Sequence, residues 1–512
     1  MATAEAPVRL SLRAGRRSQA ARSALLQIEL RRNAMVWIAP VTIVLFYFTT
    51  FRPVMALPAL WGLRTLAMQT DALIAFGPFV AGAAAWMGSR EGRRDTAEMV
   101  AGTARARWSA QLVTWGATTL WALASFAVCV AAVYIATAIQ ASWGAAEWWP
   151  AAVDAAWIVA LSAVGFAAGA MFPSRFAAPL AALITAVALE IAFRAELPLV
   201  PLDPLHPALR FSPYSLALPT IGLPLIPFDA GIYYPFLPDL SIVQTMLGAG
   251  LAAVAIGGLG LREIARRGAR RLVATALALT LAGIAASLAA VILAGGAIPD
   301  EHGMIEIPAL HYSADDHPYS YTPACNAAAI PVCVHPAFRG EMPGLARMLR
   351  PVARDLAGLP GVPVRVDLDA SANNQLAVAT GTHCQHTRNG VECHSSALVA
   401  GYGAGTVSGT PPTLHFAFDL ESIAGGTLDD AAVQNFAQAT IGGRGDTARA
   451  AIAGALIHDA GIPLGMDDFA LIAPALAVAR RFSELPAASQ RAWIRFHWSA
   501  LRAGEITLAQ LP

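Results

Sequence analysis

Histidine and aspartate side chains that could act on a substrate lie near the C-terminal end of the chain. The closest approach to a hydrolytic zinc motif is ALIHDAG at 455–461, in which Asp459 follows His458 and Ile462 occupies the position of a second histidine. A His-Glu-x-x-His site needs two histidines on one helical turn and a glutamate as the base. Because the glutamate and the second histidine are missing, the sequence predicts no peptidase activity. A degenerate zinc-peptidase-like domain stays an alternative.

Cysteines offer a second kind of chemistry in the same region. Four of the five cysteines lie there: Cys325, Cys333, Cys384 and Cys393. An even number of cysteines in an oxidising compartment predicts disulfides, and among three connectivities we favour the short-range pairs Cys325–Cys333 and Cys384–Cys393. Zinc is the alternative, because histidines flank these cysteines at 335, 383, 386 and 394. The spacing matches no Cys-x-x-Cys motif, so we expect no metal.

The chain contains no lysine, and all 35 of its basic residues are arginine. A P-loop needs a lysine on the nucleotide phosphates, and Schiff-base chemistry needs a lysine amine. The sequence therefore excludes an ordinary nucleotide-hydrolysing site. We expect a non-catalytic chain without a cofactor and without a nucleic-acid partner.

The apolar runs of the sequence predict where these side chains lie relative to a membrane. The chain is 56% hydrophobic and only 13% charged, which is typical of an integral membrane protein. A helix needs roughly 20 apolar residues to cross the bilayer core. Seven runs meet this length approximately, near 34–51, 70–88, 112–139, 153–172, 176–193, 241–261 and 272–296.

The arginines predict the orientation of these spans. Alternate segments between the apolar runs are rich in arginine, with seven before residue 33, five in 89–111, one in 173–175 and five in 262–271. The intervening segments hold only Arg52, Arg64, Arg194 and Arg210. Cytoplasmic loops carry the excess of basic residues, so we expect a cytoplasmic N-terminus in the cytoplasmic membrane. Seven crossings then place everything after about residue 297 outside.

Two charged features adjoin the spans. Residues 1–33 predict a basic amphipathic helix on the inner membrane surface, held by apolar burial and by anionic lipid. Glu190 lies well inside a predicted span, where a carboxylate is a functional candidate. Arg194 follows four residues later on the same helical face, so an ion pair at the helix end is the other interpretation.

The segment 88–108, GSREGRRDTAEMVAGTARARW, has an ordered pattern of charges. Its order resembles the loop before the third span of ABC-2-type transporter permeases. The matching residues are Glu91, Arg93, Arg94, Thr96, Glu98, Met99, Arg107 and Trp108. The resemblance implies that six spans follow an interfacial helix and that the 89–111 loop is a coupling helix docked onto a separate ABC ATPase subunit. It also implies a second membrane half, either a homodimer partner or a related permease subunit. An ordinary positively charged loop would explain the charge but not its order.

Residues 298–512 have the patterns of a folded domain. An amphipathic helix is predicted at 341–359, strands at 362–368, 376–380 and 414–420, and helices at 429–441, 446–460, 468–482 and 486–503. This order suggests an α+β or α/β domain. The expected organisation is therefore a polytopic α-helical membrane protein with a soluble extracytoplasmic domain: a basic helix at 1–33, a six-span permease domain at 34–271, a seventh span at 272–297 and an external disulfide-containing domain at 298–512.

Two classes of function fit this organisation. The first is the permease subunit of an ABC-2-type exporter, which couples ATP hydrolysis by its partner to transport across the bilayer. The second is a polytopic membrane sensor or immunity protein whose external domain binds a ligand and which transports nothing. The sequence does not identify a substrate, because the spans consist mainly of alanine, leucine, valine and glycine.

Overall fold

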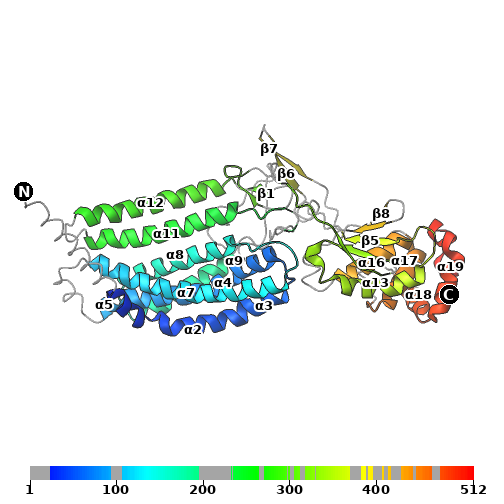
Figure 1. Cartoon of the computed structure of the whole chain (residues 1–512), viewed down its shortest axis with the longest axis horizontal. Coiled ribbons are helices and arrows are strands. Elements are labelled where there is room, and N and C mark those ends of the chain that lie inside the picture. Colours follow the sequence, from blue (N-terminus) through cyan, green and yellow to red (C-terminus); the bar gives the residue numbers. More distant parts are fainter. Residues whose placement is uncertain are drawn as a thin grey trace, which may run out of the picture.

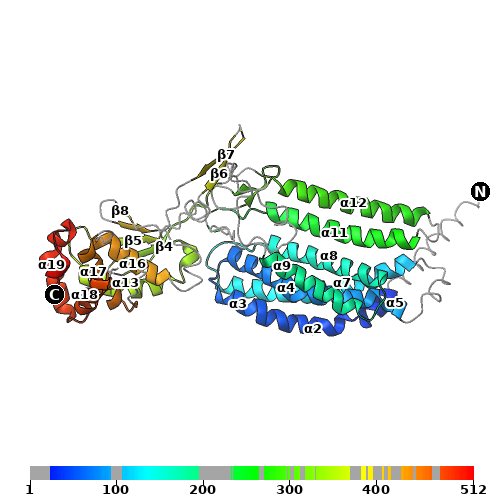
Figure 2. The ribbon, with the colours of Figure 1, turned by 180° about the vertical axis from the view of Figure 1, so that it is seen from behind.

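The computed structural model shows a long helical bundle with a mixed helix and strand domain at one end (Figure 1). We call residues 317–512 the tail domain. The structure describes residues 24–93, 107–194, 232, 234–264, 270–296, 298–299, 305–311, 317–328, 330–368, 382–387, 390–395, 406–408, 413–416, 428–441, 446–463 and 473–512. The reverse view shows the same division, with α19 at the end of the molecule farthest from α5 (Figure 2).

The bundle consists of long apolar helices. A helix over 24–31 precedes it. Its elements are α2 (Met35–Phe46), η1 (Tyr47–Phe51), α3 (Arg52–Ala56), α4 (Trp61–Gly88), α5 (Arg90–Arg93), α7 (Arg107–Gln140), α8 (Trp149–Met171), α9 (Ala177–Arg194), α11 (Asp239–Ile264) and α12 (Arg270–Ala294). Among the described residues, six helices are long and apolar enough to cross a bilayer. The protein is therefore membrane-embedded.

Six of the seven predicted spans are confirmed as such helices, and the remaining one, predicted at 176–193, is the shorter α9. The apolar part of α9 covers only Ala177–Ile191. The whole helix has 18 residues and is about 27 Å long, slightly less than the hydrocarbon thickness. It runs antiparallel to α4, because Gly82 lies against Ala178 and Ala182 whereas Gly77 lies against Leu189. It thus has the direction that alternating crossings require.

The largest difference from the predicted spans is at the start of α4. This helix begins at Trp61 rather than at residue 70, and its first turns contain the buried Arg64. The guanidinium group of Arg64 donates to the carbonyl oxygen of Leu57 at 2.8 and 3.2 Å. Carbonyl groups at a helix end have no partner within the helix, so Arg64 caps the end of α3. Hydropathy alone could not reveal this use of a charged residue.

Small residues allow α4 and α8 to pack closely. A Cβ atom on Gly165 would collide with the carbonyl oxygen of Ala81, and one on Gly169 would collide with that of Ala85. Both pairs have the same offset in sequence, so the two helices run parallel. Because lipid and leucine are equally apolar, helices in a membrane associate through such close packing rather than through the hydrophobic effect.

The tail domain is built on a mixed five-stranded sheet. Its strand order is β3-β4-β5-β9-β8, in which β4, β5 and β9 are parallel and the outer two are antiparallel to their neighbours. The strands are β3 (Ala324–Cys325), β4 (Val332–Val334), β5 (Arg365–Leu368), β8 (Thr406–Ser408) and β9 (Thr413–Phe416). The pairs β1 (Ile298–Pro299) with β2 (Ile305–Glu306), and β6 (Thr382–Thr387) with β7 (Gly390–Ser395), are separate hairpins.

Helices complete the tail domain. They are α13 (Met342–Leu356), α16 (Leu428–Ile441), α17 (Thr447–Asp459), α18 (Ala473–Ser483) and α19 (Ala487–Ala503), with short 3-10 turns η3 (Pro336–Phe338) and η5 (Leu508–Gln510). The helices predicted in this region are present with shifts of a few residues. The strand predicted at 362–368 is shorter, and the one at 376–380 lies outside the described residues. Leu63 of α4 and Leu60, which precedes that helix, belong to the same buried cluster as the tail core, which joins bundle and tail.

The packing of α4 against α8 makes a direct prediction. Gly169→Ala is expected to lower the melting temperature of the detergent-purified protein, because the new methyl group must push the two helices apart. Gly116→Ala is the matched control, since nothing lies within 4 Å of a Cβ at that position in α7. The control is expected to be neutral or to gain up to about 1 kcal/mol from helix propensity. Equal melting temperatures for the two variants would contradict the packing described.

Candidate functional site

The helix ends that adjoin the arginine-rich segments lie at the end of the bundle opposite the tail domain (Figure 1). We call this end the arginine end. Arg90 forms a bidentate ion pair with the buried Glu29, with distances of 2.7 and 3.1 Å. Gly92 lies against Pro173 in the α8–α9 turn, and Trp108 lies against Gly260 near the end of α11. Four segments that are distant in sequence therefore meet here.

Two interactions hold the ends of the 94–106 segment. Glu91 accepts a hydrogen bond from Arg107 at 2.6 Å, which joins α5 to the start of α7. Trp108 is buried, and its indole N–H donates to the carbonyl oxygen of Ile256 at 3.2 Å. The residues that flank this segment thus connect α5, α7 and α11.

Arg93 is held against the bundle by a different contact. Its guanidinium carbon lies 3.5 Å from the centroid of the Trp86 ring, and a guanidinium nitrogen donates to the Trp86 carbonyl oxygen at 2.9 Å. Of the eight residues in the predicted coupling loop, the structure therefore brings Glu91, Arg107 and Trp108 into one contact region and places Arg93 beside it. The other four, Arg94, Thr96, Glu98 and Met99, lie outside the described residues.

Glu190 is not buried in the bundle core. Its side chain is exposed on α9, beside Ile74 and Pro78 of α4. The side chain of Arg194 lies outside the described residues, so the predicted ion pair stays a prediction.

Asp154 is a completely buried acid of the bundle that the sequence analysis did not single out. Its side chain is completely buried in α8, and neither carboxylate oxygen has a hydrogen-bond partner among the described residues. The nearby α4–α11 contact is also polar, because the amides of Gln69 and Gln244 meet at 3.4 Å. A carboxyl group in this position is costly and marks a functional candidate. Its place in the fourth apolar run was the signal that could have identified it.

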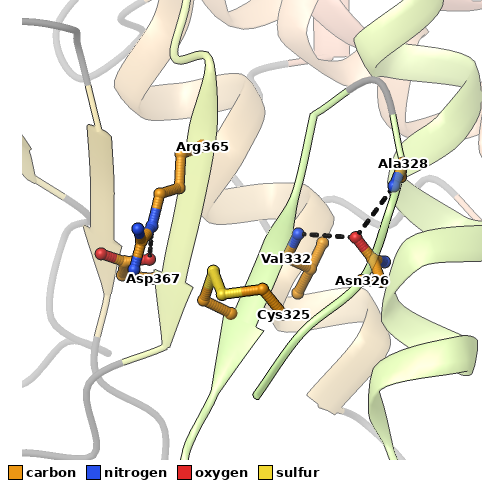
Figure 3. The surroundings of a disulfide bond; sticks show 7 residues. Cys325, Asn326, Ala328, Val332, Arg365 and Asp367 are labelled. Atoms are coloured by element: carbon orange, nitrogen blue, oxygen red, sulfur yellow. Dashed lines mark hydrogen bonds and ion pairs between the residues drawn. A yellow bond between two sulfur atoms is a disulfide. The ribbon is translucent and has the colours of Figure 1, made fainter. Parts of the chain in front are cut away.

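The predicted pair Cys325–Cys333 is a disulfide (Figure 3). It joins directly opposed residues of β3 and β4. Asn326 closes the turn between these strands, since its side-chain oxygen accepts from the backbone N–H groups of Ala328 and Val332 at 3.3 and 3.0 Å. Cys384 and Cys393 are also directly opposed, in the β6–β7 hairpin, but their side chains lie outside the described residues.

An aromatic cluster joins the tail domain to the bundle. His335 is buried, and its ring centroid lies 4.8 Å from that of Trp143 and 4.1 Å from that of Tyr321. Trp143 stands in the turn between α7 and α8, and its indole N–H donates to the carbonyl oxygen of Ile232 at 3.1 Å. The neighbouring Ser142 donates to the carbonyl oxygen of Pro336 at 2.8 Å. We call this cluster the tail joint.

The electrostatics of the tail joint favour a neutral histidine. Burial lowers the pKa of His335 from 6.5 to about 4. Its Nδ1 accepts a hydrogen bond from the backbone N–H of Ala337 at 3.1 Å, which requires an unprotonated nitrogen. The sequence did not predict that His335 is buried against Trp143 and Tyr321, because both partners are far from it in sequence.

The histidine of the ALIHDAG stretch does not assemble a site. His458 is exposed at the end of α17, and Ile462 is buried. Burial raises the pKa of the neighbouring Asp459 above its ordinary value. Within the part of the chain that the structure describes, no three His, Cys, Asp or Glu side chains gather closely enough to hold a metal ion.

Comparisons with known proteins do not identify a relative: no family model matches the chain, and neither curated proteins nor solved structures include a significant match.

The second cysteine pair can be tested by thiol labelling. In the Cys129→Ser variant, which removes the single buried cysteine of the bundle, the denatured, unreduced protein is expected to take up no maleimide. Reduction should then expose four thiols. The reason is that directly opposed residues of an antiparallel pair have Cα atoms within about 5.5 Å, which a disulfide can span. Two reactive thiols before reduction would show that Cys384 and Cys393 are not paired.

The tail joint makes the stability of the protein depend on pH. The pKa of His335 is lower in the folded state than its ordinary value of 6.5, so folding favours the neutral ring. This contribution is complete above about pH 6.5 and is lost progressively as the pH falls toward about 4. The melting temperature of the wild type should fall across this window. His335→Asn keeps a side-chain acceptor but cannot titrate, and its curve should be flatter. Parallel curves would exclude His335 as the cause.

Proposed function

We propose that this chain is the membrane subunit of an ABC-2-type exporter, driven by a separate ATPase subunit. The proposal rests on the contacts that hold the residues on both sides of the 94–106 segment to the bundle. The ion pair of Glu91 with Arg107 and the bond of Trp108 to the α11 backbone link this segment to three helices. A partner that pressed on the segment would therefore move the ends of these helices. Coupling between two distant sites needs a physical connection of this kind.

The distribution of charge supports an orientation in the cytoplasmic membrane. The arginine end faces the cytoplasm in this proposal, because basic residues are retained on that side. The tail domain at the other end of the bundle is then extracytoplasmic. An oxidising exterior agrees with the disulfide between Cys325 and Cys333. The missing lysine agrees with a separate ATPase, since ATP-driven transport by this chain needs a partner with a P-loop.

The second half of the transporter belongs to the same proposal. The chain supplies one set of spans, and we infer that a second copy or a related permease subunit completes the pathway. ATP-driven closure of the partner would push on the 89–111 region and reorient the spans. The tail domain would bind or shield the substrate outside the membrane.

A membrane sensor is the second candidate function, and a cavity in the tail domain favours it. This cavity has a volume of about 670 Å³ and lies between α13 and the sheet. Ile330, Leu349 and Val364 contribute to an apolar lining, and Arg350 and Arg354 line it as well. Such a cavity suits an apolar ligand with an acidic group. A sensor of this kind would need no ATPase.

A charge-swap series tests the exporter proposal. The full-length protein, purified from its native membranes, is expected to retain a P-loop ATPase and to stimulate its ATP hydrolysis. Glu91→Arg and Arg107→Glu should each reduce the retained ATPase about fivefold to tenfold, because each places like charges together. The double swap should restore retention, since it rebuilds the ion pair.

Arg175→Glu is the matched control for this series. Arg175 lies at the same end of the bundle but outside the 89–111 segment, so its reversal should leave retention unchanged. Absence of any P-loop protein from the wild-type preparation, or full retention by both single variants, would reject the exporter proposal. The first of these outcomes would leave the sensor as the favoured function.

A further inference from the structure

A groove on the outer face of α4 opens between α2 and α9 at the arginine end. It forms a cavity of about 1110 Å³, to which the helix over 24–31, α2, α4, α5 and α9 all contribute. Phe79 and Trp86 of α4 line it, and both rings remain partly exposed. Trp37 of α2 also lines the cavity and is 82% exposed. Aromatic rings in such positions are typical of the membrane–water boundary.

The charged residues of this groove are mainly basic. Four arginines line it, at positions 31, 32, 90 and 93, together with Glu29 and Glu91. Glu29 is paired with Arg90, and Glu91 is paired with Arg107, which lies outside the lining. The guanidinium groups of Arg31 and Arg32 are exposed and form no ion pair with any described residue. The groove thus has an excess of positive charge at its mouth.

An apolar channel continues from the basic part of the groove. A second cavity of about 370 Å³ shares Pro78 with the first and extends along α4 and α9. Its lining includes Ile74, Val187 and Ile191, and Glu190 is the single charged residue in it. From Trp86 to Ile74 the rise of α4 is about 18 Å, which exceeds half of the hydrocarbon thickness of about 30 Å. An acyl chain of one leaflet has a similar reach.

We propose that this groove is a binding site for an anionic glycerophospholipid. The head group contacts Arg31 and Arg32, and one acyl chain lies in the apolar channel between α4 and α9. Basic cavities between membrane helices bind anionic head groups through charge, while the apolar wall accounts for a lipid rather than a free phosphate. Because the occupied groove touches α2, α4, α5 and α9, the lipid connects the N-terminal helix to the bundle. This proposal does not depend on the exporter function.

Native mass spectrometry of the full-length protein tests the site. Phosphatidylglycerol is expected to remain bound where phosphatidylcholine is lost. The pair Arg31→Gln and Arg32→Gln should weaken retention of phosphatidylglycerol by about 30-fold, from the attraction that two basic residues give an anionic lipid. The matched control is Arg175→Gln with Arg262→Gln, which removes the same charge from exposed positions at the same end.

Two further measurements distinguish a lipid site from simpler explanations. Ala186→Phe fills the apolar channel without changing charge and should also weaken retention. The soluble head group glycerophosphoglycerol should not displace the bound lipid. Equal losses in the control pair, equal retention of phosphatidylcholine, or full displacement by the head group alone would each overturn the proposal.

Discussion

The exclusion of charge from the hydrocarbon core determines how this molecule is arranged. One arginine at the centre of a bilayer costs about 2.5–3.5 kcal/mol, so arginine-rich segments cannot lie within the spans. In this chain they meet at one end of the bundle, where Glu29 and Glu91 neutralise part of their charge. The tail domain is consequently attached at the opposite end. Each functional proposal for the protein begins from this polarity.

Inside the bundle, close packing replaces the hydrophobic effect. Gly165 and Gly169 let the backbones of α4 and α8 touch. Asp154 of α8 is buried in this bundle without a hydrogen bond to any described residue. The tail joint connects the turn between α7 and α8 to the tail domain.

Much of the architecture could be predicted from the sequence, because hydropathy and the positions of the arginines are properties of short segments. Hydropathy predicted the six long helices, and the even number and short spacing of the cysteines predicted the pair Cys325–Cys333. Other features depend on contacts between distant segments. Hydropathy counts Arg64 as a break, yet it caps α3, and nothing near His335 in sequence indicates that it packs against Trp143. Glu190 and Asp154 both lie in apolar runs of the sequence, and only the folded chain shows that Glu190 is exposed whereas Asp154 is buried.

The candidate site at the arginine end was predicted only in part, for a similar reason. The order of residues from Glu91 to Trp108 suggested a coupling loop, but only the folded chain brings Glu91 to Arg107 and Trp108 to α11. We propose that an ATPase binds this loop. Site-specific photo-crosslinking from position 98, in the full chain within native membranes, tests this binding. We expect a crosslink to a P-loop ATPase from position 98 and none from position 175. Crosslinks only to lipid, or the same products from both positions, would contradict it.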